Sequence, residues 1–119
     1  MKNDNVIRDK SKKFAVRIIR FYKYLFDEKK ENVISKQILR SGTSIGANVR
    51  ESGRAQSNAD FYSKLNIALK EADETAYWLE ILYESEIIDK KQFLSLYNEC
   101  EELISILTSI TKNQRLKIQ

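Results

Sequence analysis

Two glutamates and an arginine-flanked stretch with two glycines are the parts of this sequence whose residue types could do chemistry. Glu71 and Glu74 are three residues apart, which places both carboxylates on one side of a helix. Paired carboxylates can act as general acid and general base. The sequence contains no histidine, and Trp78 follows the pair by one turn. An interface in which Arg40 or Arg50 neutralises the glutamates is therefore the favoured interpretation.

The stretch RSGTSIGANV, residues 40–49, could be a phosphate loop, a helix break or a close packing surface. A loop of the GxxxxGK[ST] type needs a preceding apolar strand and a lysine beside the last glycine, and neither is present. The helical period instead continues through the stretch at Ile34, Ile38, Ser41, Ile45, Asn48 and Ser52. Gly42, Gly46 and Gly53 share one side of this helix, so we expect another helix to pack closely there.

Other catalytic patterns are missing from the sequence. It has one cysteine, no CxxC pair, no nucleotide-binding loop and no spaced set of carboxylate and histidine ligands. Asn48, Glu71 and Glu74 are the only polar cluster that could be suspected of catalysis. Cys100 lies among leucines at helical spacing, which favours a small core residue over a reactive thiol. We expect no enzymatic activity, no cofactor and no metal.

The elements that position these residues are predicted to be four helices in one domain, residues 1–119. Proline is absent and glycine occurs three times, so little interrupts a helix. Apolar residues at alternating three and four spacing predict helices at about 5–28, 33–56, 59–85 and 90–112. Links of only about two to six residues make neighbours antiparallel. The predicted fold class is all-α, an up-down-up-down antiparallel four-helix bundle.

Each predicted helix has an apolar seam for the core, and short capping signals precede two of them. The seam of the first helix is Ile7, Phe14, Ile18, Phe21 and Leu25, widened by Ala15, Ile19, Tyr22 and Phe26. The third has Phe61, Leu65, Ala68, Ala72, Thr75, Leu79 and Leu82, and the fourth has Phe93, Leu96, Cys100, Leu103, Leu107 and Ile110. Ser57 or Asn58 can cap the third helix, and Asp89 with Gln92 predicts a capping box on the fourth.

Basic residues are concentrated in the first part of the chain. Residues 1–50 contain 13 Lys or Arg against 5 Asp or Glu, whereas residues 51–119 contain 8 against 12. The first helix carries Lys10, Lys13, Arg17 and Arg20 in one row, and the second carries Lys36, Arg40, Arg50 and Arg54. Such rows can contact phosphates without reading sequence. The alternative is that Arg40 and Arg50 form salt bridges and the row on the first helix is only solvated.

The third helix has a second ordered face, away from its core seam. Ile67, Glu71, Glu74, Trp78 and Ile81 repeat there at a spacing of four, three, four and three. A tryptophan aligned with two isoleucines is typical of a buried interface. This face predicts self-association.

The segments RSGTSIGANVRES and DFYSKLNIALKEADETAYWLEIL resemble the four-helix-bundle family named after proteins encoded in intervening sequences of bacterial 23S rRNA genes. The likeness extends over nearly the whole chain, although Ser52 and Gly53 stand where that family commonly has alanine after the glutamate. The chain is also similar to the accessory variability proteins of diversity-generating retroelements. The resemblance implies a homo-oligomer, a ring-shaped pentamer, without catalytic activity and with a role in binding nucleic acid.

The function predicted from the sequence is a non-catalytic, oligomeric bundle that binds RNA or DNA nonspecifically through the two basic rows. The alternative is a scaffold that binds another protein and no nucleic acid. The chain begins with charged residues and has no apolar window long enough to span a bilayer, so we expect a cytoplasmic protein that does not enter a membrane.

Overall fold

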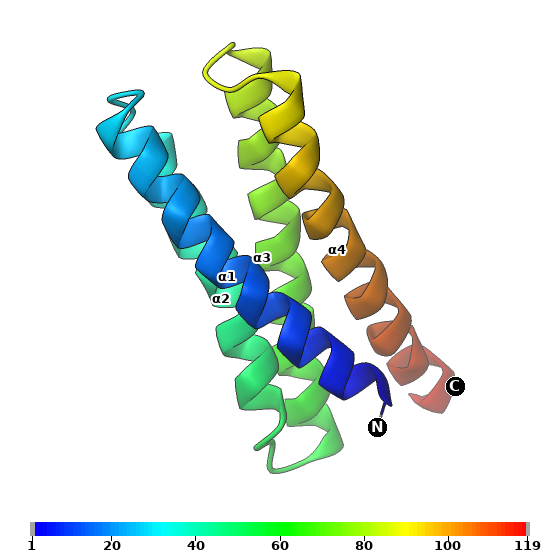
Figure 1. Ribbon diagram of the computed structural model, residues 1–119. Helices are drawn as coiled ribbons and strands as arrows, with labels where there is room; N and C mark the ends of the chain where they lie inside the picture. The colour runs from blue at the N-terminus through cyan, green and yellow to red at the C-terminus, as the bar shows by residue number, and fades with distance from the viewer. Residues whose placement is uncertain (1, 119) are drawn as a thin grey trace.

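Four antiparallel helices make up the computed structural model of the protein (Figure 1). The helices are α1 (Lys2–Asp27), α2 (Ile34–Ser52), α3 (Asn58–Glu84) and α4 (Lys90–Ile118). The structure describes the backbone of residues 2–118 and the side chains of residues 5–113. Each helix runs opposite to the one before it, and α1 packs beside both α2 and α4. The predicted all-α, up-down-up-down bundle is confirmed.

Polar side chains cap the starts of three helices. The carboxylate of Glu31 accepts hydrogen bonds from three backbone amides at the start of α2, those of Val33, Ile34 and Ser35. Ser57 accepts from the amide of Asp60 at the start of α3. Asp89 and Gln92 form the predicted capping box on α4, each side chain accepting from the other residue's amide. These bonds satisfy amides that have no partner inside the helix.

Two helix ends differ from the predicted bounds. The second helix ends at Ser52 and not near residue 56, because the amides of Gly53, Arg54 and Ala55 bond to carbonyls three residues back, the tighter pattern that closes a helix. The fourth helix continues to Ile118, beyond the predicted end at residue 112. The last residues of α4 therefore belong to the helix, although their side chains lie outside the described residues.

One hydrophobic core runs along the bundle axis, and the predicted seams supply most of it. Phe14, Ile18, Leu65, Leu79 and Leu103 are among its fully buried side chains. The expected widening of the first seam is wrong at Ile19 and Phe26, which are 41% and 42% exposed. The neighbouring helices cover a limited arc of α1, roughly 100° wide, and these two residues lie beyond it. Phe61 and Phe93 are half-buried, while Tyr62 is buried.

The glycines of α2 allow α1 and α2 to approach closely. A Cβ atom built on Gly42 would lie 2.8 Å from both γ carbons of the buried Ile18 side chain. At Gly46 it would lie 3.2 Å from the carbonyl oxygen of Ser11. The helix continues through both positions because neither glycine has a positive φ. The predicted continuous helix across residues 40–49 is confirmed, and its first two glycines lie against α1.

Gly53 does not fit the expectation of close helix packing. It follows the last residue of α2 as its C-cap and is exposed to solvent. A Cβ there would meet only the carbonyl oxygen of Arg50, in its own turn, at 3.4 Å. The expectation fails because the helix ends before this glycine.

Candidate nucleic-acid interface

The basic row of α1 lies along the edge that faces α4. Lys10 forms an ion pair with Glu102, with 3.0 Å between Nζ and Oε1. Arg17 forms an ion pair with Glu99 and also donates to the hydroxyl and the carbonyl of Ser95, at 2.8 and 3.3 Å. Two of the four predicted phosphate contacts on α1 are therefore occupied by acidic partners on α4, and both hold the two helices together.

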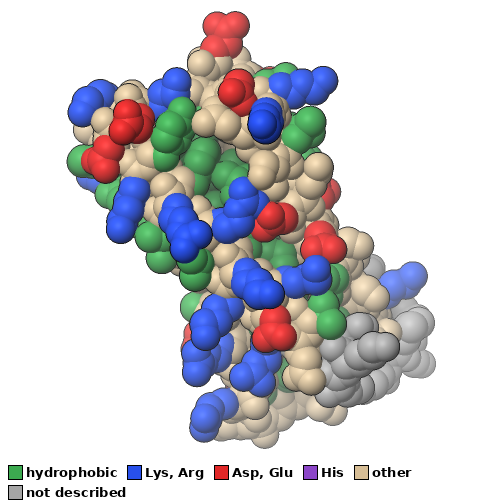
Figure 2. All heavy atoms as spheres, viewed as in Figure 1, with side chains coloured by type: hydrophobic (Ala, Val, Ile, Leu, Met, Phe, Trp, Pro, Cys, Tyr) green, Lys and Arg blue, Asp and Glu red, His purple; other side chains and the backbone are tan. Residues whose placement is uncertain are grey.

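The other two cations of this row are exposed. Among residues 5–113, no acidic side chain forms an ion pair with Lys13 or Arg20. Figure 2 shows Lys and Arg side chains following α1 across the view and continuing over the lower part of the molecule, where α2 ends. Acidic side chains are interspersed toward the α4 side. The unpaired positive charge of this row is thus exposed along the same edge of α1.

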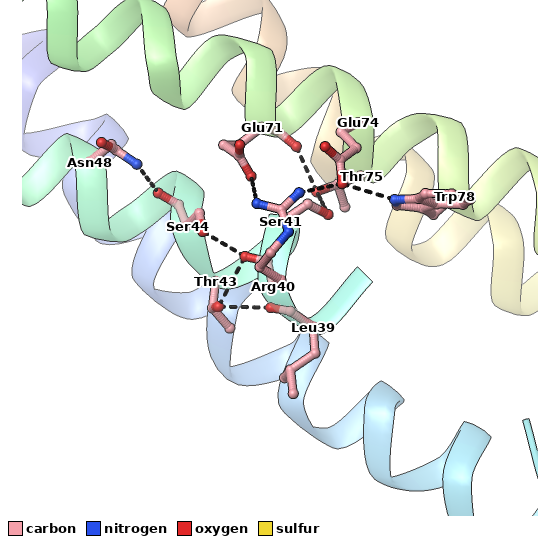
Figure 3. Close-up of polar contacts among 10 residues, drawn as sticks. All are labelled: Leu39, Arg40, Ser41, Thr43, Ser44, Asn48, Glu71, Glu74, Thr75 and Trp78. Carbon is pink, nitrogen blue, oxygen red and sulfur yellow. Dashed lines mark hydrogen bonds and ion pairs between the residues drawn. The ribbon is translucent and has the colours of Figure 1, made fainter. Parts of the chain in front are cut away.

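The basic residues of α2 also divide, among the described side chains, into one that is ion-paired and three that are not. Arg40 points to α3 and bonds to Glu71, at 3.0 Å, and to Glu74 (Figure 3). Lys36, Arg50 and Arg54 are exposed and form no ion pair with the described acidic side chains. The interpretation of Arg40 as a salt-bridge partner therefore matches its contacts, whereas Arg50 has no such partner among the described side chains.

The contacts of Arg40 belong to a polar network between α2 and α3 (Figure 3). The indole of Trp78 donates to Glu74 at 3.0 Å. This hydrogen bond lowers the pKa of Glu74, Arg40 lowers it further, and partial burial opposes both. A general acid needs the opposite shift, so the environment of Glu74 suits a carboxylate that is ionised near neutral pH. Asn48, the third member of the suspected cluster, donates to the carbonyl of Ser44 in its own helix.

Lowering the pH should remove the stabilising contribution of Glu74. Its pKa is lower in the folded chain than its usual value of 4.5, so the contribution is present above pH 4.5 and is lost as the pH falls through the folded-state value. We expect the emission of Trp78, the only tryptophan, to change in the same pH range because its acceptor becomes protonated. Fluorescence and urea denaturation between about pH 7 and pH 3 measure both effects.

The control for that pH series is Glu84→Gln, on the exposed side of the same helix. Glu74→Gln should abolish the acid-dependent change in Trp78 emission, whereas Glu84→Gln should leave it intact. A Glu74→Gln protein with the same titration as wild type would show that another group controls the emission.

Part of the α3 face that was predicted to be an interface is covered or ion-paired within the same chain. Ile67 is 40% exposed, whereas Ile81 and Trp78 are half-buried and Trp78 packs against the core. Glu71 and Glu74, between them, face Arg40. The apolar part of this face that remains open to a partner is centred on Ile67.

Cys100 is fully buried, and its thiol donates to the carbonyl of Ala72 at 3.2 Å. Burial raises the pKa of the thiol to about 12, and the negative charges of Glu101 and Asp73 add to the shift. A thiol with so high a pKa is unreactive near neutral pH. These surroundings are those of a core residue.

Sequence reasoning missed two sets of residues. The acidic partners Glu99 and Glu102 were not singled out, although their spacing of three places them on one side of α4. Arg8 and Lys12 were also missed, and they lie across from Arg50 at a hollow between α1 and α2. The periodicity of α1 places Arg8 and Lys12 on the side opposite Lys10 and Arg17, but the sequence contains no signal for what faces them.

The chain is thus a small helical bundle with a basic α1–α2 surface and a polar network between α2 and α3, and comparisons with known proteins identify its family. The model of the 23S rRNA-intervening sequence proteins matches residues 3–109, so the chain belongs to that family. A solved structure of a protein of unknown function from the S23 ribosomal protein family of Bacteroides thetaiotaomicron is similar, with 60% identity and a TM-score of 0.91. The match covers 92% of this chain and 98% of that one. No protein of curated function matches.

Two features are absent from the residues that the structure describes. No three Cys, Asp or Glu side chains in that part of the chain are placed to hold a metal ion. Within the same residues, none of the helices combines the length and apolar character needed to cross a bilayer.

Proposed function

We propose that this protein is a non-catalytic, self-associating bundle that binds RNA or DNA through the outer surface of α1 and α2, without reading sequence. The observation that carries the proposal is the group of exposed cations without an intramolecular ion pair among the described side chains, Lys13, Arg20, Lys36, Arg50 and Arg54. Lys10, Arg17 and Arg40 are left out of this group, because each is paired with a glutamate of a neighbouring helix.

Self-association would strengthen this interaction. The formal charge is +4 per chain, and the family resemblance implies a ring-shaped pentamer, for which the total would be about +20. A field of that strength attracts polyanions and accelerates their encounter. Contacts to phosphates alone give affinity without sequence preference.

A binding titration tests the proposal. Fluorescein-labelled single-stranded RNA and duplex DNA are titrated with the purified protein at about 50 mM and about 200 mM salt, and affinity should fall steeply between them because bound phosphates release counterions. Absence of binding to either probe at the lower salt would overturn the proposal. If the protein were nevertheless oligomeric, a protein-binding scaffold would be the better description.

Reversing Lys13 and Arg20 to glutamate should weaken binding and flatten its salt dependence. On duplex DNA, the slope against salt should fall by roughly 0.9 for each phosphate that the variant no longer neutralises. Lys70 and Lys112 are exposed cations on α3 and α4, so their reversal is a control with the same change in net charge. Equal losses of affinity in the two double variants would mean that total charge alone determines binding.

Self-association has a separate test. We expect native mass measurement of the wild-type protein to give an oligomer at micromolar concentration, and Ile67→Glu to shift it toward the monomer. Ile67 is already exposed in the chain, so the substitution should leave the helical circular dichroism signal nearly unchanged. Ser63, one turn earlier on α3 and also exposed, provides a control as Ser63→Glu. A monomeric wild-type protein would contradict this part of the proposal.

A further inference from the structure

A hollow of about 310 Å³ lies between α1 and α2, on the opposite side of α1 from the edge that faces α4. Its lining comes from both helices: Arg8, Asp9, Lys12 and Ala15 from α1, and Thr43, Gly46, Ala47 and Arg50 from α2. The hollow combines Arg50, from the basic row of α2, with Arg8 and Lys12 of α1, which belong to neither row.

Small side chains create this hollow. Gly46 brings the two helices together, since a Cβ there would be 3.2 Å from the Ser11 carbonyl oxygen. Ala15 and Ala47 then leave space above that contact, where longer side chains would fill it. The hydroxyl of Thr43 donates to the Leu39 carbonyl at 2.7 Å, so it has no proton to offer a ligand. Donors to a ligand must therefore come from the charged side chains.

Three cations surround the space and are not neutralised by the described side chains. Arg8 and Lys12 are one turn apart on α1, and Arg50 lies across from them on α2. None of the three forms an ion pair with a described acidic side chain. Asp9 is the one acid in the lining, which leaves a formal charge of +2. The groove between α1 and α4 differs, because Lys10 and Arg17 there are paired with glutamates.

We propose that this hollow binds a phosphate group of the nucleic-acid backbone, held by Arg8, Lys12 and Arg50. Guanidinium groups match the oxygens of a phosphate in two parallel hydrogen bonds, and the ammonium of a lysine adds a point charge. The inference rests on the proposed nucleic-acid binding and names one of its contact sites. In this proposal the small residues of α2, Gly46 and Ala47, have two effects: they allow close helix packing, and they leave room for a phosphate.

Neutral substitutions and a charge-matched control test the site. The probe is a fluorescein-labelled single-stranded oligodeoxythymidylate. Changing Arg8, Lys12 and Arg50 together to glutamine should reduce the salt slope by roughly 0.7, the contribution of the one phosphate that the site neutralises on a single strand. Changing the exposed Lys70, Lys90 and Lys112 to glutamine removes the same charge elsewhere and should reduce the slope less.

Two single substitutions add to the test, and Ala47→Leu does so without changing the net charge. Ala47→Leu fills the hollow without changing charge and should weaken binding, and Asp9→Asn should strengthen it. Circular dichroism verifies that each variant is folded. If the two triple variants lost affinity equally and Ala47→Leu bound as wild type, the site would be refuted while nucleic-acid binding stood.

If the wild-type protein binds no oligonucleotide at all, a second measurement tests the phosphate site by itself. Inorganic pyrophosphate is titrated into the wild-type protein and the amide resonances of Thr43, Gly46 and Ala47 are followed by NMR. Shifts confined to these amides, and absent from the glutamine variant of Arg8, Lys12 and Arg50, would support the phosphate site even though the proposed function had failed. If none of these amides shifted, the phosphate site would be overturned together with the proposed function.

Discussion

Replacing Gly42 with leucine is expected to lower the free energy of unfolding by about 3 kcal/mol, the upper part of the range for overpacked cores. Even the first atom of the new side chain would lie 2.8 Å from two carbons of Ile18, which is fully buried and cannot turn away. Because Ile18 is branched at Cβ, few alternative rotamers are open to it. The helices must separate, and chemical denaturation followed by circular dichroism measures the loss.

The other two glycines provide graded controls for this prediction. Gly46→Ala would place a Cβ 3.2 Å from a backbone oxygen, so a small shift of α1 offsets the gain of about 1 kcal/mol in helix propensity. At Gly53 the new Cβ would make one ordinary van der Waals contact and φ is −68°, so we expect no loss of stability from Gly53→Ala. If Gly42→Leu were as stable as Gly53→Ala, close contact between α1 and α2 would not be important for folding.

Arg40→Glu should be the second large effect, with a loss of about 2 kcal/mol in the free energy of unfolding. The substitution removes both ion pairs of Arg40 and brings a third carboxylate toward Glu71 and Glu74. Breaking a fully buried pair costs more, but the Arg40 side chain is 51% exposed, so water screens part of the charge. Urea denaturation near neutral pH gives the loss.

A neutral background distinguishes repulsion from impaired packing. In the double variant with Glu71→Gln and Glu74→Gln, the further change Arg40→Glu should cost much less than in the wild-type protein. The emission of Trp78 follows the same network, because its indole donates to Glu74. Equal costs in both backgrounds would show that the charges of the two glutamates are not what Arg40 balances.

The fold could be predicted because its signals are local and repeat. The spacing of Phe14, Ile18, Phe21 and Leu25 defines one side of α1 whatever it packs against, and all four are buried. The period also continues through Gly42 and Gly46, which identified them as packing positions in a helix and not as a break. Short links then leave few arrangements other than an antiparallel bundle.

The pairing of charges across helices could not be predicted from spacing. Which glutamate faces Lys10 or Arg17 depends on how far α4 slides along α1, and a seam of apolar residues allows several registers. The ion pairs with Glu102 and Glu99 divide the basic row into two cations with an acidic partner and two without one among the described side chains. Gly53 was misassigned for a related reason, since helical spacing alone does not show where a helix ends.

The two ion pairs between α1 and α4 also make the edges of the bundle unequal in their response to salt. Arg17 and Lys10 join helices that touch each other less than any other neighbours do, whereas Gly42 and Gly46 lock α1 to α2 through uncharged contacts. Added salt screens the first kind of contact and leaves the second. Amide hydrogens of α4 should therefore exchange faster at high ionic strength while those of α2 stay protected. We therefore expect ionic strength to influence which side of the bundle opens first.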